Sequence, residues 1–179
     1  MTSITTYTKK MFDPLAPKEE FLDIHDIAHS LSLLCRANGH FPEFYSVGEH
    51  CVNCTREAQA RGYSVRVQLA CLLHDASEAY LSDVTRPVKS ALPEYKKIEN
   101  ALADVIYKKW LGSSLTEGEY AIMRDVDDTM LYYEMLHYFG EKISATAPNL
   151  CSKPFFSFDG FEKTERDFLD RFESLKKLI

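Results

Sequence analysis

Leu72-Leu73-His74-Asp75-Ala76-Ser77-Glu78 places a histidine and an aspartate inside a stretch that otherwise suits a buried helix. Leucines precede the His-Asp pair and small residues follow it, so both polar side chains are predicted to face the interior. Burying an imidazole beside a carboxylate costs free energy unless a partner compensates them, and a metal ion is a common partner. One pair cannot hold a metal ion alone, so the question is whether the rest of the chain supplies further ligands.

The sequence on either side of this stretch has helical periodicity almost throughout. Ser46 with Glu49, and Thr116 with Glu119, have the spacing of capping boxes, which mark helix starts. Pro87 suits a loop or a first helical turn, and Gly112 suits a helix end. Neither a repeat nor a linker is visible. We therefore expect one all-α domain over residues 1–179, a helical bundle with the site between helices. The expected helices cover about residues 23–36, 46–62, 64–80, 93–111, 116–140 and 159–178.

Composition limits the classes of function. The chain has 179 residues, 45% of them hydrophobic, and a net charge of −6, which argues against binding a nucleic acid polymer. No apolar run suits a membrane span and no signal peptide is evident, so we expect a cytoplasmic protein without a membrane partner. The five cysteines are odd in number, which argues against a disulfide framework. Cys51 and Cys54 share one predicted helix face and are expected to be ordinary buried thiols.

Two further helices offer inward-facing ligands to join His74 and Asp75. His50 lies between Val47 and Cys54 on the apolar stripe of its helix. Asp127 is bracketed by apolar residues three and four positions away, whereas its neighbours Asp125 and Asp128 fall on polar faces. Two imidazoles and two carboxylates suit Mn²⁺, Fe²⁺, Co²⁺, Ni²⁺, Zn²⁺ or Mg²⁺. A lone inward histidine or aspartate is usually structural, but four on three helices indicate a divalent metal site.

A second His-Asp pair, His25-Asp26, is not part of this set. It lies in the opening turn of the first expected helix, and no leucine run precedes it. There Asp23 or Asp26 can interact favourably with the helix dipole. We therefore expect helix-capping chemistry from this pair and no metal.

The set His50, His74-Asp75 and Asp127 resembles the motif of the HD-domain metal-dependent phosphohydrolases. The segments Tyr45–His50, His74–Glu78 and Asp83–Lys89 further resemble the 5′-deoxynucleotidase branch and the related phage-type deoxynucleoside triphosphatases. The match covers a core of about residues 20–140, and the expected C-terminal helix at about 159–178 is less diagnostic. The resemblance implies a small HD-type helical bundle that forms a homodimer or a higher homo-oligomer and acts on a nucleotide.

The resemblance also implies roles for four more residues. Glu78 is implied to be catalytic, and a carboxylate near a metal can orient a water or carry its proton; a salt bridge to a nearby cation is the alternative. Asp83 is implied to be catalytic or to protonate the leaving group, although an aspartate there can simply form a turn. Arg36 matches a phosphate- or sugar-contacting arginine. Lys89 is a second phosphate candidate, and either cation can instead lie on the surface.

These residues predict metal-assisted hydrolysis of a phosphoester by an activated water. The ligand set does not distinguish a 5′-monophosphate from a triphosphate substrate, because the metal core is the same for both. A cyclic-nucleotide or alarmone phosphodiesterase is an alternative. Alarmone hydrolases of this superfamily carry Glu-Asp where this chain has Glu78-Ala79, which counts against that activity. A non-catalytic nucleotide-sensing module is a further alternative, and the intact ligand set counts against it.

Overall fold

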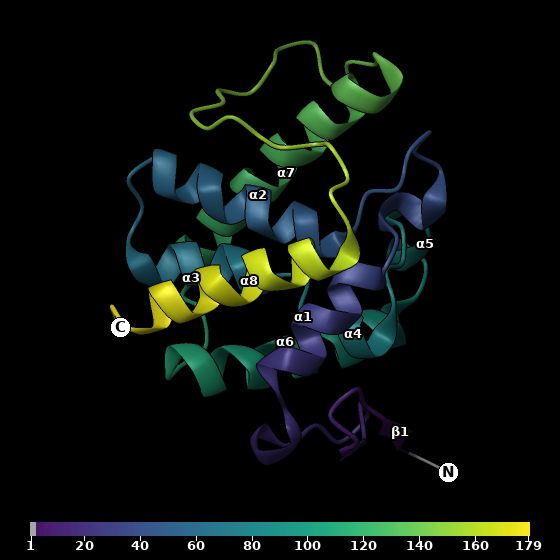
Figure 1. Cartoon of the computed structure of the whole chain (residues 1–179), viewed down its shortest axis with the longest axis vertical. Coiled ribbons are helices and arrows are strands. Elements are labelled where there is room, and N and C mark those ends of the chain that lie inside the picture. Colours follow the sequence, from purple (N-terminus) through teal and green to yellow (C-terminus); the bar gives the residue numbers. More distant parts are fainter. Residues whose placement is uncertain (1–2) are drawn as a thin grey trace.

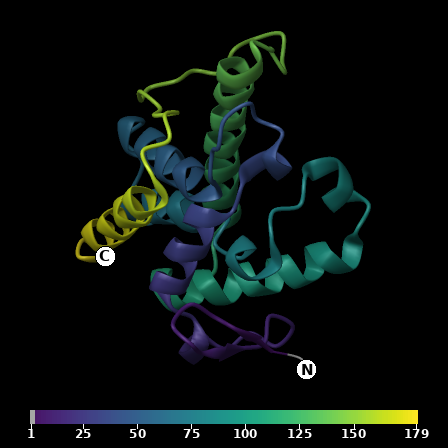
Figure 2. The ribbon, with the colours of Figure 1, turned by 45° about the vertical axis from the view of Figure 1, so that its right-hand side comes forward.

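Helix α2 (Val47–Ala60) packs against four other helices and forms the centre of the molecule (Figure 1). The computed structural model describes residues 3–179 and shows a mostly helical, single-domain fold. α7 crosses one side of this bundle, and α6 runs along its base (Figure 2). The remaining elements are β1 (Ile4–Thr5), β2 (Met11–Phe12), η1 (Glu19–Phe21), α1 (Ile24–Leu33), η2 (Arg36–Gly39), α3 (Val65–Leu73), α4 (Glu78–Leu81), α5 (Arg86–Ser90), α6 (Pro93–Leu111), α7 (Glu117–Phe139) and α8 (Phe161–Lys176).

The strongest local signals in the sequence set the helix ends. Both predicted capping boxes are confirmed, at the starts of α2 and α7. α6 covers the predicted range, with a proline in its first turn and Gly112 at its C-cap. That glycine has φ +80°, a left-handed conformation that suits glycine best. Pro87 lies in the first turn of α5, as predicted for one of its two possible roles.

The first helix is shorter than predicted. It ends at Leu33 rather than near residue 36, because the next residues pair with the segment that precedes α2. Arg36 N–H donates to the Tyr45 carbonyl, and Val47 N–H donates to the Leu34 carbonyl. This pairing draws the backbone out of the helix and brings the start of α2 beside the end of α1.

The N-terminal residues form a small antiparallel hairpin, β1 with β2, that the helical periodicity did not predict. Phe12 extends from β2 into the core, where its ring stacks on Tyr80. The main core lies between α1, α2, α3, α6 and α8. Its largest fully buried side chains include Phe12, Leu22, Ile27, Leu31, Leu69, Leu72, Leu73, Leu102, Ile106 and Phe168. Within residues 3–179, no helix is both long enough and apolar enough to cross a membrane.

Candidate metal centre

The His74-Asp75 pair lies in a turn between two helices. His74 directly follows α3, and α4 begins at Glu78, so the prediction of one continuous helix over residues 64–80 is wrong. In the turn, backbone N–H groups bond to carbonyls three residues earlier, which is the tighter 3₁₀ pattern. His74 Nδ1 lies 2.8 Å from the Cys71 carbonyl oxygen. In a continuous α-helix, the Asp75 N–H would donate to this Cys71 carbonyl. Here the His74 ring donates to it instead.

Hydrogen bonds assign the proton positions of both buried histidines. A carbonyl oxygen only accepts, so His74 carries a proton on Nδ1. His50 Nδ1 lies 2.6 Å from Glu134 Oε1 and donates to that carboxylate. The two Nε2 atoms are 3.1 Å apart. With a proton on Nδ1, Nε2 is the atom of each ring that is left to bind a cation.

Two carboxylate oxygens complete the cluster. Asp75 Oδ2 lies 3.1 Å from His74 Nε2 and 3.8 Å from His50 Nε2. Asp127 Oδ1 lies 3.1 Å from His50 Nε2 and 3.8 Å from His74 Nε2. Metal–ligand bonds of about 2.0–2.2 Å place neighbouring donors about 3.0–3.6 Å apart. The structure thus brings the four predicted ligands together: the three distances of 3.1 Å fall within this range and the two of 3.8 Å are slightly longer.

The cluster attracts positive charge. Burial alone lowers the pKa of His74, but the Asp75 carboxylate raises that pKa well above its ordinary value. Burial alone raises the pKa of Asp127, but its contacts with His50 and His74 hold that pKa well below its ordinary value. The carboxylates therefore stay ionised, as ligands of a metal ion must be.

Glu134, which the sequence analysis missed, lies behind the histidines. It is fully buried, and it accepts hydrogen bonds from His50 Nδ1 at 2.6 Å and from Arg36 Nε at 2.9 Å. Burial alone raises the pKa of Glu134, but Arg36 and His50 lower it to about 2. A carboxylate that orients a ligating histidine is a common feature of metal sites. Its position in the sequence could have indicated this role, because Glu134 follows Asp127 by two helical turns and therefore lies on the same face of α7.

Arg36 lies among carboxylates. Besides Glu134 it faces Asp75 Oδ2 at 3.5 Å and Asp127 Oδ1 at 3.6 Å. Its position depends on η2, where Ala37 has φ +54° and the next residue has φ +51°. Non-glycine residues adopt this left-handed conformation at a cost, and such strain gathers at functional sites. The predicted contact of Arg36 with phosphate or sugar stays a prediction.

A pocket of about 440 Å³ opens over the ligand cluster, a volume that suits a small molecule. Its lining includes Asp75 and Asp127 together with the predicted residues Glu78, Asp83, Lys89 and Arg36. It also includes apolar side chains, among them Phe41, Leu131, Met135 and Ile143. The lining therefore offers charged groups to an anionic part of a ligand and apolar groups to an uncharged part.

Glu78 lines the pocket and is almost completely buried. Its Oε1 is 3.4 Å from Lys89 Nζ, so the salt bridge that the sequence offered as an alternative is present. Within residues 3–179, no hydrogen-bond partner lies near its Oε2. Burial, together with the charges of Asp75 and Asp83, raises the pKa of Glu78 well above its ordinary value. A buried carboxyl with a raised pKa and one free oxygen is suited to proton transfer.

Asp83 and Lys89 both lie near Glu78. Asp83 Oδ2 accepts a hydrogen bond of 3.2 Å from the Ala37 N–H, so it joins η2 to the turn after α4. Burial raises the pKa of Asp83. Lys89 Nζ is 2.6 Å from Glu99 Oε1 in addition to its contact with Glu78. Both residues line the pocket, and their implied roles stay predictions.

The thiols of Cys51 and Cys54 lie beside the histidines, and both are buried, as predicted. Cys54 Sγ is 3.5 Å from His50 Nε2, and Cys51 Sγ is 4.0 Å from His74 Nδ1. Burial raises the pKa of both thiols, so they pack against the rings as neutral groups.

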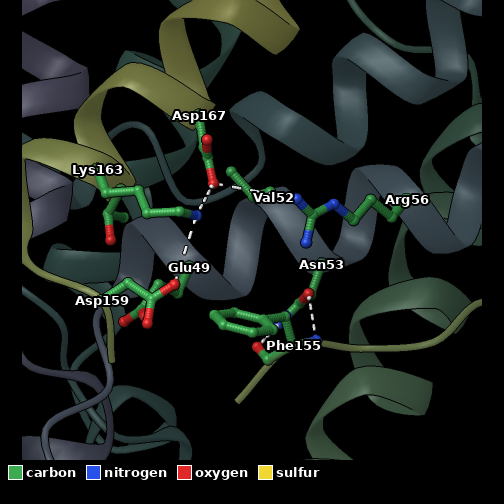
Figure 3. A pocket seen from close by; sticks show the side chains of 9 residues that line it. Glu49, Val52, Asn53, Arg56, Phe155, Asp159, Lys163 and Asp167 are labelled. Carbon is green, nitrogen blue, oxygen red and sulfur yellow. Dashed lines mark hydrogen bonds and ion pairs between the residues drawn. The ribbon is translucent and has the colours of Figure 1, made fainter. Parts of the chain in front are cut away.

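A second cavity, between α2 and α8, has a volume of only about 20 Å³ (Figure 3). Ion pairs line it, since Lys163 lies between Asp159 and Asp167, and Arg56 reaches Asp167 (Figure 3). A space of this size holds about one water molecule. The residues here therefore join α8 to α2 and leave no room for a larger ligand.

No model of a known protein family matches the chain. Two relatives are similar over its larger part. The uncharacterized protein YfdR of Escherichia coli (strain K12) is 37% identical over 110 residues, which are 62% of this chain and 59% of YfdR. The uncharacterized protein RCAP_rcc00048 of Rhodobacter capsulatus is 36% identical over 107 residues, or 56% of this chain and 54% of that protein. The chain therefore matches little more than half the length of each relative.

Proposed function

We propose that this protein is a divalent-metal-dependent phosphohydrolase that acts on nucleotides. The observation that carries the proposal is the convergence of His50, His74, Asp75 and Asp127, with five donor–donor distances of 3.1–3.8 Å, beside a pocket that Asp75 and Asp127 line. The choice of nucleotides rests on the resemblance of the sequence motifs and on the size of the pocket. Substrates with a 5′-monophosphate and with a triphosphate both fall within the proposal.

Bound to these four ligands, a divalent ion supplies Lewis-acid activation of water and of a phosphate oxygen. The chain's own residues perform the remaining tasks. Glu134 and the Cys71 carbonyl fix the two imidazole rings. Glu78, through its free Oε2, accepts the proton of the attacking water. Lys89, which contacts Glu78, stabilises negative charge in the pocket.

The acid that serves the leaving group is assigned to Asp83. Its raised pKa and its position in the pocket support this role, because a protonated carboxyl can donate to the oxygen that departs. The apolar side chains of the pocket lining, among them Phe41, Leu131 and Met135, take the nucleoside. Hydrolysis of a monophosphate at this site releases inorganic phosphate and a nucleoside.

A chromatographic product assay tests the proposal. Each deoxynucleoside monophosphate and triphosphate is offered with Mn²⁺ or Co²⁺, and His74→Ala serves as the inactive control. Conversion of a monophosphate to its nucleoside establishes a 5′-nucleotidase. Consumption of a triphosphate establishes a triphosphatase, and the released fragment identifies the phosphorus that is attacked. An absence of turnover with any nucleotide and any divalent metal refutes the proposal.

The predicted alternatives give different results in the same assay. A cyclic-nucleotide or alarmone phosphodiesterase leaves simple nucleotides intact and cleaves a phosphodiester or pyrophosphate ester. A nucleotide-sensing module binds a nucleotide without converting it. The homodimer and the cytoplasmic location stay predictions, and sedimentation of the purified protein measures the first.

A further inference from the structure

Arg86 bridges two neighbouring carboxylates of α7. Its Nη2 lies 2.7 Å from Asp127 Oδ2, and its Nη1 lies 2.5 Å from Asp128 Oδ1. Asp127 turns its other oxygen, Oδ1, toward His50. The two oxygens of Asp127 are therefore divided between the ligand cluster and Arg86, so one carboxylate joins the candidate metal site to a cation in the pocket wall.

Of the three cations that line the pocket, Arg86 is the most exposed. Its side chain is 54% exposed, compared with 12% for Arg36 and 22% for Lys89. Arg36 faces three carboxylates, and Lys89 is paired with Glu78 and Glu99. More than half of the Arg86 side chain is in solvent, so an incoming anion can reach its guanidinium.

The charges around the pocket oppose the binding of an anion. The lining contains four carboxylates and three cations, which are Asp75, Glu78, Asp83 and Asp127 with Arg36, Arg86 and Lys89. Each cation also has carboxylate partners of its own. A phosphate group therefore needs a divalent cation in the site and a cation released from its carboxylate. A divalent cation bound to Asp127 meets both needs. It adds positive charge to the site, and it weakens the hold of Asp127 on Arg86 because it draws negative charge away from the oxygen that Arg86 contacts.

We propose that Arg86 binds the substrate's phosphate and that its release from Asp127 couples metal binding to phosphate binding. The inference rests on the proposed function and adds to it the residue that makes phosphate affinity depend on the metal. A guanidinium can bind two phosphate oxygens at once, so Arg86 exchanges one paired contact with carboxylates for another with phosphate. Before metal binding, the same side chain compensates the charge of Asp127.

Isothermal titration calorimetry tests this coupling with Mn²⁺ alone and with inorganic phosphate in the presence and absence of Mn²⁺. The proteins are the wild type, Arg86→Ala, Arg86→Lys and Asp128→Asn, and Asp75→Asn serves as the blank for phosphate complexed by free Mn²⁺. Arg86→Ala is expected to bind Mn²⁺ at least as tightly as the wild type, because a competitor for Asp127 is gone. In the presence of Mn²⁺, Arg86→Ala is expected to bind phosphate about tenfold or more weakly than the wild type, because it has lost a charge-assisted contact.

The other variants sharpen the test. Asp128→Asn removes only the negative charge of the second partner of Arg86, so its phosphate affinity is expected to equal or exceed that of the wild type. Arg86→Lys keeps the positive charge but lacks the planar guanidinium that can bind two phosphate oxygens at once. It is therefore expected to bind phosphate with intermediate affinity. The sign of these changes separates the proposal from a structural role, since loss of structure weakens metal and phosphate binding together.

Three results decide against the inference. If Arg86→Ala loses affinity for Mn²⁺ and phosphate in parallel, Arg86 only positions Asp127. If both affinities are unchanged, Arg86 has no part in the site. If the wild type binds no divalent metal, the proposed function fails and the inference fails with it. In the first two cases the metal site stands, so the two failures are distinguishable.

Discussion

The dipeptide His-Asp occurs twice in this chain, and the two copies have different surroundings. His25-Asp26 opens α1, where Asp23 caps the helix by accepting from the His25 N–H at 2.9 Å. Asp26 is buried and accepts two hydrogen bonds from Thr8, at 2.6 Å from its N–H and 3.0 Å from its hydroxyl. The predicted capping role is confirmed for Asp23, and Asp26 additionally ties the N-terminal segment to α1.

His74-Asp75 differs in what distant segments bring to it. Its imidazole and carboxylate meet His50 from α2 and Asp127 from α7, and Arg36 lies beneath them. Neutral donors satisfy the buried Asp26, whereas charged groups and a second imidazole surround Asp75. The comparison teaches that neither the dipeptide nor the burial of its aspartate is enough to propose a metal site. The proposal depends on which groups converge on the pair from elsewhere in the chain.

The largest expected difference between the two pairs is in metal binding. Asp75→Asn removes one donor from the cluster and is expected to weaken Mn²⁺ binding by more than about 100-fold, beyond what loss of an outer partner causes. Asp26→Asn is expected to leave Mn²⁺ affinity unchanged and to lower the free energy of unfolding by about 1–3 kcal/mol, because it impairs buried hydrogen bonds. Calorimetric titration with Mn²⁺ and urea denaturation measure the two effects.

Equal losses of Mn²⁺ affinity in Asp75→Asn and Asp26→Asn would contradict the expected difference between the two His-Asp pairs. Circular dichroism of Asp75→Asn is the control for folding, and Arg36 keeps Glu134 and Asp127 as partners in that variant. If Asp75→Asn binds Mn²⁺ as tightly as the wild type, the cluster is not the metal site.

Glu78→Gln separates catalysis from metal binding at the second pair. Turnover of the nucleotide substrate is expected to fall by about 10²–10⁴-fold, the usual contribution of a positioned acid–base group. Mn²⁺ affinity is expected to stay within a few-fold of the wild type, because the ligand atoms come from other residues. The raised pKa of Glu78 means that its ionised form is disfavoured in the folded state, so a neutral glutamine is expected to increase stability at neutral pH. Product chromatography, titration and thermal denaturation check the three readouts.

A Glu78→Gln variant that loses metal and turnover together would contradict this assignment, since the side chain would then act as a ligand. Lys89→Met is a useful companion variant because it removes the cation that contacts Glu78 Oε1.

Glu134→Gln tests the support behind His50. Glutamine keeps the shape of the side chain but replaces the carboxylate that accepts from His50 and Arg36 with a neutral amide. Mn²⁺ affinity is therefore expected to fall by about 10–100-fold. Glu57→Gln is the matched control. Glu57 is also a fully buried glutamate, but it accepts from Arg61 and from the backbone N–H groups of residues 151 and 152. Equal losses of Mn²⁺ affinity in the two variants would show a general effect of burial.

The sequence predicted the parts of the structure that depend on nearby residues. Pro93 and Gly112 mark the ends of α6, and the apolar neighbours of Asp127 distinguish it from the two aspartates beside it. The same reasoning placed the four ligands on inward faces, and the structure brings them together. The confirmed elements all have a local cause, either a cap, a turn residue or a periodic stripe.

The parts that were missed depend on distant contacts. The break after α3 coincides with a bond from the His74 ring to a carbonyl, which periodicity does not reveal. Glu134 meets His50 across 84 residues, so its function appears only when α2 and α7 pack. Arg86 likewise acquires its partners from α7. Pairing of the segments around Leu34 and Tyr45 shortened α1 for the same reason.

The smallest expected effect concerns the cap of the first His-Asp pair. Asp23→Ala is expected to lower the free energy of unfolding by about 0.5–2 kcal/mol at neutral pH, the usual value of an N-cap. Partial burial alone raises the pKa of Asp23, but Lys10 and the His25 N–H hold it below its ordinary value of 3.8. The stabilisation is therefore fully present above pH 3.8 and is lost as the pH falls through the lower native pKa. Urea denaturation of both proteins at pH 7 and in stronger acid is expected to show a difference that shrinks on acidification. A difference that stays constant with pH would mean that the charge of Asp23 does not matter, and an accompanying loss of Mn²⁺ affinity would mean that the two pairs are coupled.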